Sequence, residues 1–349
     1  MSARLLLYGA TGYTGRLIAT ELRRRGIQPI LAGRDASRLA ALASGAEVRV
    51  ARLDDERALG AALEGVTAVL HCAGPFSATA MPMAGACIAR KVHYLDITAE
   101  VGVIESLATL GSAARRAGSM IMPAVGFDVV PSDCLAAHVA RRLPGAVRLA
   151  IGLSGLRLIT RGSARTFLQG WDRGFARRRG VLVPTPLGEL RRSFDFGSGP
   201  RSSVSISWGD VATAYYTTGI ANVDTYFESN PILENILIAA RTLGWMSRTP
   251  PWQNWLDWLA DNALPDGPST AERDRAQAVI VAEATDEAGR RATARLRAPE
   301  AYTFTATTSA TVAARVLAGD LEPGFQTPGR VYGPDFVCAF DGVQREDLD

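Results

Sequence analysis

Cysteine and histidine are scarce in this sequence, and neither is spaced as a metal ligand or a structural cross-link would be. The chain of 349 residues holds four cysteines without a CxxC pair and three histidines, each in an apolar context. This pattern indicates neither a disulfide framework nor a zinc site, and it favours the reducing cytoplasm as the compartment. We interpret His71, His93 and His138 as structural residues.

Neither positive nor negative side chains are in large excess. The sequence has 38 lysines and arginines against 35 aspartates and glutamates, which gives a formal net charge of +3. So small a surplus does not favour a nucleic-acid or membrane-surface partner. HExxH and GxSxG motifs are absent too, so small-molecule chemistry other than hydrolysis fits the composition best.

A targeting signal is not evident in the first residues. No basic segment precedes an apolar one there, so we expect no signal peptide. Residues 65–89 hold no charged side chain and are long enough to span a bilayer. Because this stretch contains Pro75, Pro82 and several glycines, we predict a buried strand, a turn and a helix rather than a transmembrane segment.

The first 125 residues do have a regular pattern, in which short apolar runs alternate with amphipathic ones. This is typical of an α/β fold with a doubly wound parallel sheet and helices on both faces. Helices are expected between the strands, one ending before Gly26 and one running from Val101 to Gly118. The predicted strands are RLLLYG, QPILAG, EVRVAR, AVLHCA, VHYLDI and SMIMPA.

The pattern changes after Val125 and predicts a second domain of the α+β class. A helix capped by Ser132 is expected first, and then strands, including the alternating stretch SSVSISWGDVATAYYTT. The segment ERDRAQAVIVAEATDEAGRRATARLRA predicts two strands joined by a turn at DEAG. A helix from Ala301 to Leu317 and a tail broken by proline and glycine follow.

Three glycines follow the first predicted strand and open the first predicted helix. Gly9 permits a tight turn, Gly12 lets a pyrophosphate approach the backbone, and Gly15 lets the helix pack on the sheet. The amino end of that helix then faces the phosphates. The context predicts a dinucleotide site, and the alternative is a merely tight turn.

The end of the second predicted strand indicates which dinucleotide is bound. An NAD site usually has an acidic residue there, but this chain has Gly33 and Arg34, with Arg38 one helical turn later. We therefore expect NADP, since a guanidinium can bind the 2′-phosphate. The alternative is that Arg34 and Arg38 form only a solvated face. Asp35 would weaken the preference for NADP if its side chain faced the ribose. Asp54 is either an adenine-side contact or solvated surface.

The turn after the fourth predicted strand is expected beneath the nicotinamide ribose, because ligands lie at the carboxyl ends of such strands. We interpret Cys72 in this turn as a small core residue rather than a nucleophile. The residues expected to contact the cofactor are Gly9, Thr11, Gly12, Tyr13, Thr14, Gly15, Gly33, Arg34, Arg38, Asp54, Cys72, Ala73, Gly74, Pro75 and Phe76.

Taken together, GATGYTG, AGR, AGPF, YLDITAE, GFDVVPSD and WGDVATAYYTTGI resemble the saccharopine dehydrogenase-like family of NADP-dependent oxidoreductases, and more closely its trans-acting enoyl reductase branch. The resemblance implies a Rossmann-type NADP-binding domain over residues 1–127. It further implies an α+β substrate and dimerisation domain over 128–317, with 318–349 packing back on the first domain. A homodimer is therefore expected.

Acidic and phenolic side chains at two strand exits are the candidate catalytic residues. Tyr94 and Asp96 are two residues apart, so they should point to the same side of the fifth strand. Asp96 and Asp128 are expected at the substrate edge, with Tyr94 as a candidate proton donor. The alternatives are a core position for Tyr94 and helix capping for Asp128.

Two further segments bear on the substrate. Four tryptophans between Trp245 and Trp258 could line an apolar passage, touch a membrane or form a dimer contact. The basic run from Arg173 to Gly180 is either a carrier-protein surface or a solvated helix face. The leading hypothesis is NADPH-dependent reduction of an activated C=C bond in an acyl or polyketide-type substrate. Reduction of an imine, where Arg157, Arg161 and Arg165 would grip carboxylates, and a non-catalytic NADP-binding regulator are the alternatives.

Overall fold

The computed structural model describes residues 3–155, 174–243 and 267–348, together with Thr249 and Trp252. The chain divides into two compact units, the first made of Met1–Val130 and Tyr302–Val331, the second of Pro131–Ala301 and Tyr332–Asp349. These limits differ from the expected 127 and 317. The late helix groups with the first unit, and the tail is shared between the units rather than assigned to one.

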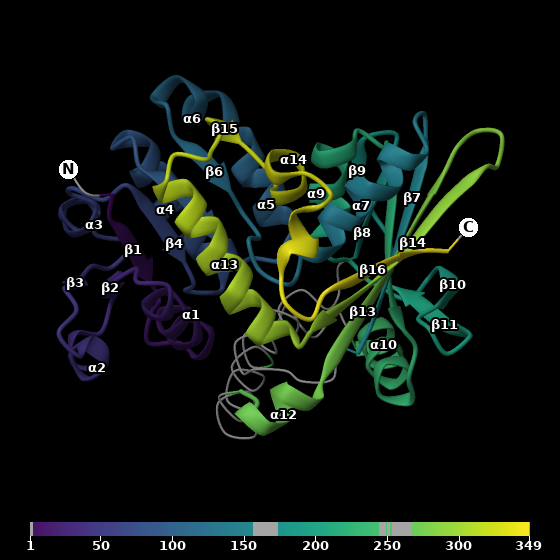
Figure 1. Cartoon of the computed structure of the whole chain (residues 1–349), viewed down its shortest axis with the longest axis horizontal. Coiled ribbons are helices and arrows are strands. Elements are labelled where there is room, and N and C mark those ends of the chain that lie inside the picture. Colours follow the sequence, from purple (N-terminus) through teal and green to yellow (C-terminus); the bar gives the residue numbers. More distant parts are fainter. Residues whose placement is uncertain (1–2, 156–173, 244–248, 250–251, 253–266, 349) are drawn as a thin grey trace. The chain divides into compact units, whose positions relative to one another are not determined.

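The first unit is built on a parallel sheet with the strand order β15-β6-β5-β4-β1-β2-β3. This confirms the doubly wound α/β fold, and all six predicted strands are present. In Figure 1 the last strand added to this sheet is β15, coloured yellow, which comes from the C-terminal part of the chain and pairs with β6. The strands are β1 Leu5–Tyr8, β2 Ile30–Gly33, β3 Val48–Val50, β4 Ala68–His71, β5 His93–Asp96, β6 Met120–Met122 and β15 Gly324–Phe325.

Strand order reverses at the centre of this sheet. β1 pairs with β2 on one side and with β4 on the other, and every residue of β1 and β4 is buried. Burial on both faces explains why these two strands appear in the sequence as continuous apolar runs. Ligands of such sheets bind beyond the carboxyl ends of the strands at the point of reversal, which here is the edge formed by the ends of β1 and β4.

The helices of the first unit agree with the sequence except at one place. The single helix expected from Val101 to Gly118 is interrupted at Leu110, which ends α5 and precedes α6. A Cβ on Gly111 would lie 3.0 Å from the Cβ of Phe325, so the break lies where β15 packs closely against α6. The helices are α1 Tyr13–Arg24, α2 Ala36–Ala43, α3 Glu56–Ala62, α4 Phe76–Ala89, α5 Val101–Thr109, α6 Gly111–Ala117, α13 Ala301–Leu317 and α14 Pro328–Tyr332.

The second unit is built on a mixed sheet with the order β10-β11-β12-β7-β13-β14-β16, to which β8 and β9 are attached at β12. β12 and β7 are parallel, whereas β13 and β14 form the predicted antiparallel pair. The α+β prediction is confirmed. The strands are β7 Arg148–Ser154, β8 Phe175–Arg178, β9 Val181–Pro184, β10 Arg191–Asp195, β11 Pro200–Ser205, β12 Asn222–Glu228, β13 Gln277–Thr285, β14 Arg291–Pro299 and β16 Gln344–Asp347.

Three expectations for the second unit were wrong. Helix α7 starts at Val130, whose N–H bonds to the carbonyl of Gly126, so Ser132 lies inside its first turn and does not cap it. The second half of SSVSISWGDVATAYYTT is not a strand, because β11 ends at Ser205 and helix α9 follows over Asp210–Thr218. The remaining helices are α10 Pro231–Leu243, α12 Thr270–Arg275 and the 3-10 helix η2 Phe336–Ala339.

The third wrong expectation is the helix face for the basic run, because its described residues, from Gly174 to Gly180, are not helical. Its described residues form the hairpin of β8 and β9. Arg177 is buried there, where its guanidinium donates to the carbonyls of Val211 and Gly180 and lies over the ring of Tyr215. A fully solvated basic face is therefore excluded at Arg177.

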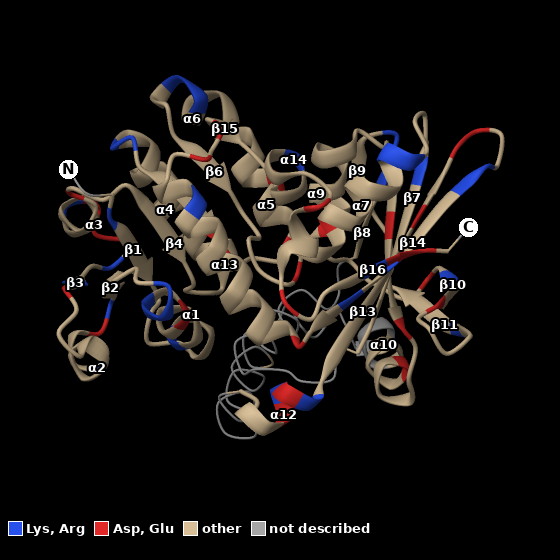
Figure 2. Cartoon of the chain, in the orientation of Figure 1, with Lys and Arg blue, Asp and Glu red and all other residues tan. Residues whose placement is uncertain are grey.

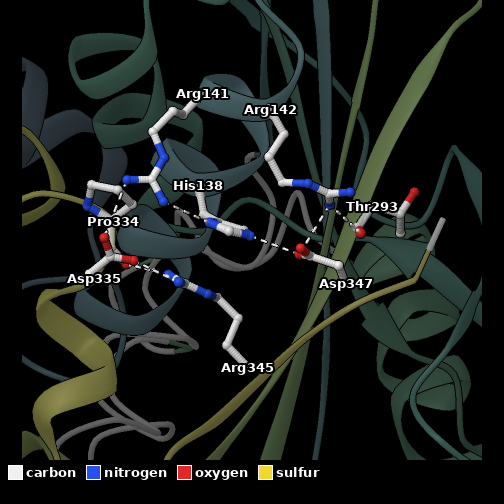
Figure 3. Close-up of polar contacts among 8 residues, drawn as sticks. All are labelled: His138, Arg141, Arg142, Thr293, Pro334, Asp335, Arg345 and Asp347. Atoms are coloured by element: carbon white, nitrogen blue, oxygen red, sulfur yellow. Dashed lines mark hydrogen bonds and ion pairs between the residues drawn. The ribbon is translucent and has the colours of Figure 1, made fainter.

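Ion pairs hold the C-terminal segment in place within the second unit, as Figure 3 shows. His138 of α7 lies 2.8 Å from the carboxylate of Asp347, which also pairs with Arg142. Arg141 and Arg345 both bind Asp335, which precedes η2. His138 thus has a structural partner, in agreement with the structural role predicted from the sequence. Figure 2 shows that both charge signs occur in each unit, as on α12.

Candidate cofactor and active site

The glycine-rich turn between β1 and α1 is shaped by two of its three glycines. Gly9 has a φ of +84°, and a Cβ there would lie 2.8 Å from the backbone nitrogen of Ala73. A Cβ on Gly15 would lie 2.3 Å from the carbonyl oxygen of Gly9. Side chains at these positions are therefore excluded by the protein's own packing, and the turn after β4 lies directly against the turn after β1.

Gly12 is different, because the protein itself leaves room for a side chain there. Its backbone is extended, and the nearest atom to a Cβ would be the Gly9 carbonyl oxygen at 3.4 Å. Gly12 is the N-cap of α1 without a side-chain cap, and the first turn of α1 has no acidic residue. The amino end of α1 thus carries a positive dipole end and open space beside the backbone, which fits a pyrophosphate.

Arginines lie next to this turn at the end of β2. Arg34 and Arg38 are exposed, and Nη2 of Arg38 lies 3.5 Å from the carbonyl oxygen of Thr11. Asp35 caps α2, where its carboxylate accepts from the N–H of Arg38 at 3.0 Å and from the hydroxyl of Ser37 at 2.7 Å. These bonds hold the pKa of Asp35 below its usual value. The carboxylate that would disfavour a 2′-phosphate is therefore engaged in the helix cap.

Asp54 forms a surface ion pair. Both of its carboxylate oxygens accept from Arg52, at 2.9 and 2.7 Å, and both side chains are exposed. Tyr8 lies near this pair and near Arg34, and burial raises the pKa of its phenol. The solvated-surface interpretation of Asp54 accounts for these contacts, and an adenine contact stays a prediction.

The turn of residues 72–75 joins β4 to α4, and we call it the β4–α4 turn. Glu100 accepts hydrogen bonds from the N–H groups of Phe76 and Ser77, at 2.9 and 3.1 Å. The hydroxyl of Thr79 lies 2.7 Å from the carbonyl oxygen of Ala73. Cys72 is only partly exposed, and burial raises the pKa of its thiol, so a thiolate nucleophile is not favoured here.

Tyr94 and Asp96 point to the same side of β5, as predicted. The Tyr94 hydroxyl donates to Oδ2 of Asp96 at 2.7 Å, and both side chains are completely buried. Oδ1 of Asp96 accepts from the N–H groups of Thr98 at 3.0 Å and Ala124 at 2.8 Å. Burial raises the pKa of Asp96 to about 6, although these hydrogen bonds oppose the shift.

Asp128 lies in the segment that leaves β6, and it is half-buried. Burial raises the pKa of its carboxyl to about 7. Helix α13 fixes this segment, because the hydroxyl of Thr305 accepts from the N–H of Phe127 at 3.0 Å and packs against Gly126. Ser309 donates to the carbonyl of Val125 at 3.3 Å. A carboxyl that is part protonated at neutral pH is therefore held on a rigid backbone.

Three of these positioning residues were missed in the sequence. Glu100 stands directly before a predicted helix, and Thr79 lies four residues after Pro75, a spacing at which hydroxyls often bond back to the backbone. The positions of Glu100 and Thr79 in the sequence could therefore have indicated their roles. Thr305 contacts a residue 178 positions away, and no local pattern announces such a contact.

Several expected functional residues lie outside the described part of the chain. These are Arg157, Arg161, Arg165 and, apart from Trp252, the tryptophans between Trp245 and Trp258. Within the described part, no group of three or more His, Cys, Asp or Glu side chains is arranged to hold a metal ion. None of the helices described is long and apolar enough to cross a membrane.

Comparison with known proteins identifies the first unit. Residues 5–122 match the family model for the saccharopine dehydrogenase NADP-binding domain. The first unit contains an NADP-binding domain of that type. This confirms NADP(H) as the cofactor, and the open backbone at Gly12 and the engaged Asp35 agree with it.

Two curated relatives and one solved structure extend the comparison. A trans-acting enoyl reductase of Mycobacterium ulcerans (strain Agy99) is 32% identical over 148 residues, which cover 40% of this chain and 35% of that protein. A trans-acting enoyl reductase of Mycobacterium tuberculosis (strain H37Rv) is 30% identical over 148 residues, again 40% of this chain and 35% of that protein. The chain thus matches little more than a third of the length of these relatives.

One solved structure is similar to this chain in fold. Apo histidine-tagged saccharopine dehydrogenase (L-Glu forming) from Saccharomyces cerevisiae matches 100% of both chains with a TM-score of 0.66 and 12% identity. The predicted resemblance to saccharopine dehydrogenase-like proteins and to trans-acting enoyl reductases is confirmed. Residues 5–122 are thus similar to the NADP-binding domain of an NADP-dependent oxidoreductase.

Proposed function

We propose that the protein reduces an activated C=C bond of an acyl-type substrate with NADPH. The observation that carries this proposal is the position of Asp128 in the segment that leaves β6, on a backbone held by Thr305, where burial raises the pKa of its carboxyl to about 7. The similarity to trans-acting enoyl reductases supports the same reaction, although it covers only part of their length.

The two candidate reductions differ in what they require from the protein. NADPH supplies a hydride when bound. A protonated imine that accepts hydride becomes a neutral amine and needs no further proton. A C=C bond conjugated to a carbonyl accepts hydride at its β-carbon and leaves an enolate, which must be protonated at the α-carbon. A carboxyl that titrates near neutral pH is suited to that proton transfer.

Asp128 supplies that proton in this proposal. Because burial raises its pKa to about 7, part of the Asp128 population is protonated at neutral pH. Asp128 gives the proton to the α-carbon and regains it from water. Tyr94 and Asp96 act by holding the backbone, because their polar atoms are buried and bonded to each other or to main-chain N–H groups. The products are the saturated acyl compound and NADP⁺.

The acyl group is carried as a thioester, on coenzyme A or on a carrier protein. A carrier-protein partner and a homodimer stay predictions of the sequence. Mass measurement in solution tests the dimer, and comparison of the same acyl chain on the two carriers tests the partner.

NADPH oxidation with two substrate panels tests the proposal. One panel contains α,β-unsaturated thioesters on coenzyme A and on a carrier protein; the other contains imines derived from α-keto acids. We expect oxidation with the unsaturated thioesters. Oxidation with imines alone would contradict the proposal and favour C–N chemistry. Tight NADPH binding without turnover in either panel would contradict it in favour of a regulator.

A further inference from the structure

The amino ends of two helices meet the carboxyl edge of the sheet where the strand order reverses, and only one of them is capped by a carboxylate. Helix α1 begins at the glycine-rich turn without a side-chain cap or an acidic residue in its first turn. Helix α4 begins at the β4–α4 turn, and its first two N–H groups, from Phe76 and Ser77, donate to the two oxygens of Glu100. An internal anion therefore occupies the amino end of α4.

The carbonyl side of the β4–α4 turn is fixed as well. The Thr79 hydroxyl lies 2.7 Å from the carbonyl oxygen of Ala73 and 3.0 Å from that of Pro75. Nε2 of His71 lies 3.0 Å from the same hydroxyl. His71 is completely buried, and burial lowers its pKa to about 3, so the ring is neutral.

The β4–α4 turn also lies beside the phosphate end of the site. The backbone nitrogen of Ala73 lies 2.8 Å from where a Cβ on Gly9 would be. A dinucleotide seated on α1 therefore extends past this turn. Its pyrophosphate needs unpaired N–H groups and a positive dipole end, which α1 offers, whereas the carboxylate of Glu100 repels phosphate from α4.

We propose that Glu100 is a positioning residue that sets the direction of NADPH in the site. Its carboxylate holds the β4–α4 turn in place and excludes phosphate from the amino end of α4. The uncharged nicotinamide end of NADPH then occupies this turn, and the phosphates remain at α1. The inference rests on the cofactor site used in the proposed function, but not on the identity of the acyl substrate.

Glu100→Gln tests this role with two ligands. One ligand is NADPH, and the other is 2′-phospho-ADP-ribose, which has the same phosphates but no nicotinamide. The amide of glutamine keeps one acceptor oxygen and places an NH₂ group against the second N–H of α4. We expect the Kd for NADPH to rise about tenfold, which corresponds to the loss of one hydrogen bond to a charged group. The Kd for 2′-phospho-ADP-ribose should stay within about twofold.

A second variant and a control keep the test decisive. Thr79→Val releases the carbonyl side of the same turn and should also weaken NADPH more than the fragment. Ser269→Ala removes a cap of similar chemistry from α12 in the second unit, and it should change neither Kd. The inference would be overturned if Glu100→Gln and Thr79→Val raised the Kd for both ligands equally. It would also be overturned if neither variant changed the Kd for NADPH. Wild-type protein that binds NADPH but reduces no unsaturated thioester would contradict only the proposed reaction.

Discussion

The hydroxyl of Tyr94 donates to Oδ2 of Asp96 across 2.7 Å, and neither side chain is exposed. The other oxygen of Asp96 accepts from the N–H groups of Thr98 and Ala124. One carboxylate thus ties β5 to the loop that follows it and to the segment that leaves β6. Four residues after Ala124 that segment carries Asp128, so we assign the pair a positioning role and the proton transfer to Asp128.

Tyr94→Phe separates these two roles. The change removes the donor to a buried carboxylate, so we expect the free energy of unfolding to fall by about 1–3 kcal/mol. Turnover with saturating substrate should stay within about threefold of wild type, because Tyr94 does not transfer the proton in this account. Chemical denaturation and steady-state kinetics check the two quantities. A loss of turnover by more than about a hundredfold, with stability retained, would instead make Tyr94 the proton donor.

Asp128→Asn tests the proton donor itself. The amide cannot supply a proton, so we expect turnover to fall by about a hundredfold or more, while the Kd for NADPH changes little. In the wild type, turnover should decrease as the pH rises above about 7, because the protonated fraction of Asp128 decreases. Asp128→Asn should lack this decrease. A pH profile that is the same in both proteins would contradict the assignment.

Asp128→Asn should also change how the stability of the protein depends on pH. The pKa of Asp128 is raised from 3.8 to about 7 by folding, so the unfolded chain ionises first, and wild type loses stability as the pH rises from about 4 to 7. Asp128→Asn removes this loss. The Tm difference between variant and wild type should therefore grow in favour of the variant over that range and level off above it. A difference that is independent of pH would show that the carboxyl is not destabilised by burial.

Gly12→Ala and Gly15→Ala form a matched pair in the glycine-rich turn. At Gly12 a Cβ would meet only the Gly9 carbonyl oxygen at 3.4 Å, so we expect a nearly unchanged Tm and a Kd for NADPH raised about tenfold or more. At Gly15 a Cβ would lie 2.3 Å from that oxygen, so the Tm itself should fall. Calorimetry and NADPH fluorescence measure the two effects. Unchanged NADPH affinity in Gly12→Ala would remove the pyrophosphate from this turn.

Arg34→Ala tests the choice between NADPH and NADH. The exposed guanidinium after β2 is the proposed ligand of the 2′-phosphate, so we expect the Kd for NADPH to rise by about tenfold or more and that for NADH to change little. Arg116→Ala on α6, also an exposed arginine of the first unit, is the control and should affect neither cofactor. Equal losses for both cofactors in Arg34→Ala would assign the 2′-phosphate to another residue.

Local patterns in the sequence were enough to predict most of the first unit. Six strands, the charge-free segment 65–89 and helix α13 follow from apolar runs and from glycine and proline positions, because these depend on neighbouring residues. The interruption at Leu110 depends on β15, more than 200 residues away, and no local signal shows it. Helix α9 was mistaken for a strand because its buried side chains include threonine and valine, which favour strands.

The residues of the candidate site also differ in whether local sequence patterns predict their roles. The glycines and Arg34 could be found because cofactor motifs have fixed spacing. The roles of Asp35 and Asp96 depend on which donors surround each carboxylate, and sequence alone does not show those donors. Asp35 is engaged by its own helix, and Asp96 by a backbone segment 28 residues later. Position in the sequence alone predicts a ribose contact for Asp35 or a catalytic role for Asp96.

Transfer of deuterium from NADPH to the product tests the proposed reduction of a C=C bond. NADPH labelled with deuterium at the transferred position of C4 is incubated with an α,β-unsaturated thioester, and the product is analysed by mass spectrometry and NMR. The account predicts one deuterium at the β-carbon and a solvent proton at the α-carbon. A product without deuterium, or labelled NADPH that is consumed only when an imine is supplied, would contradict it.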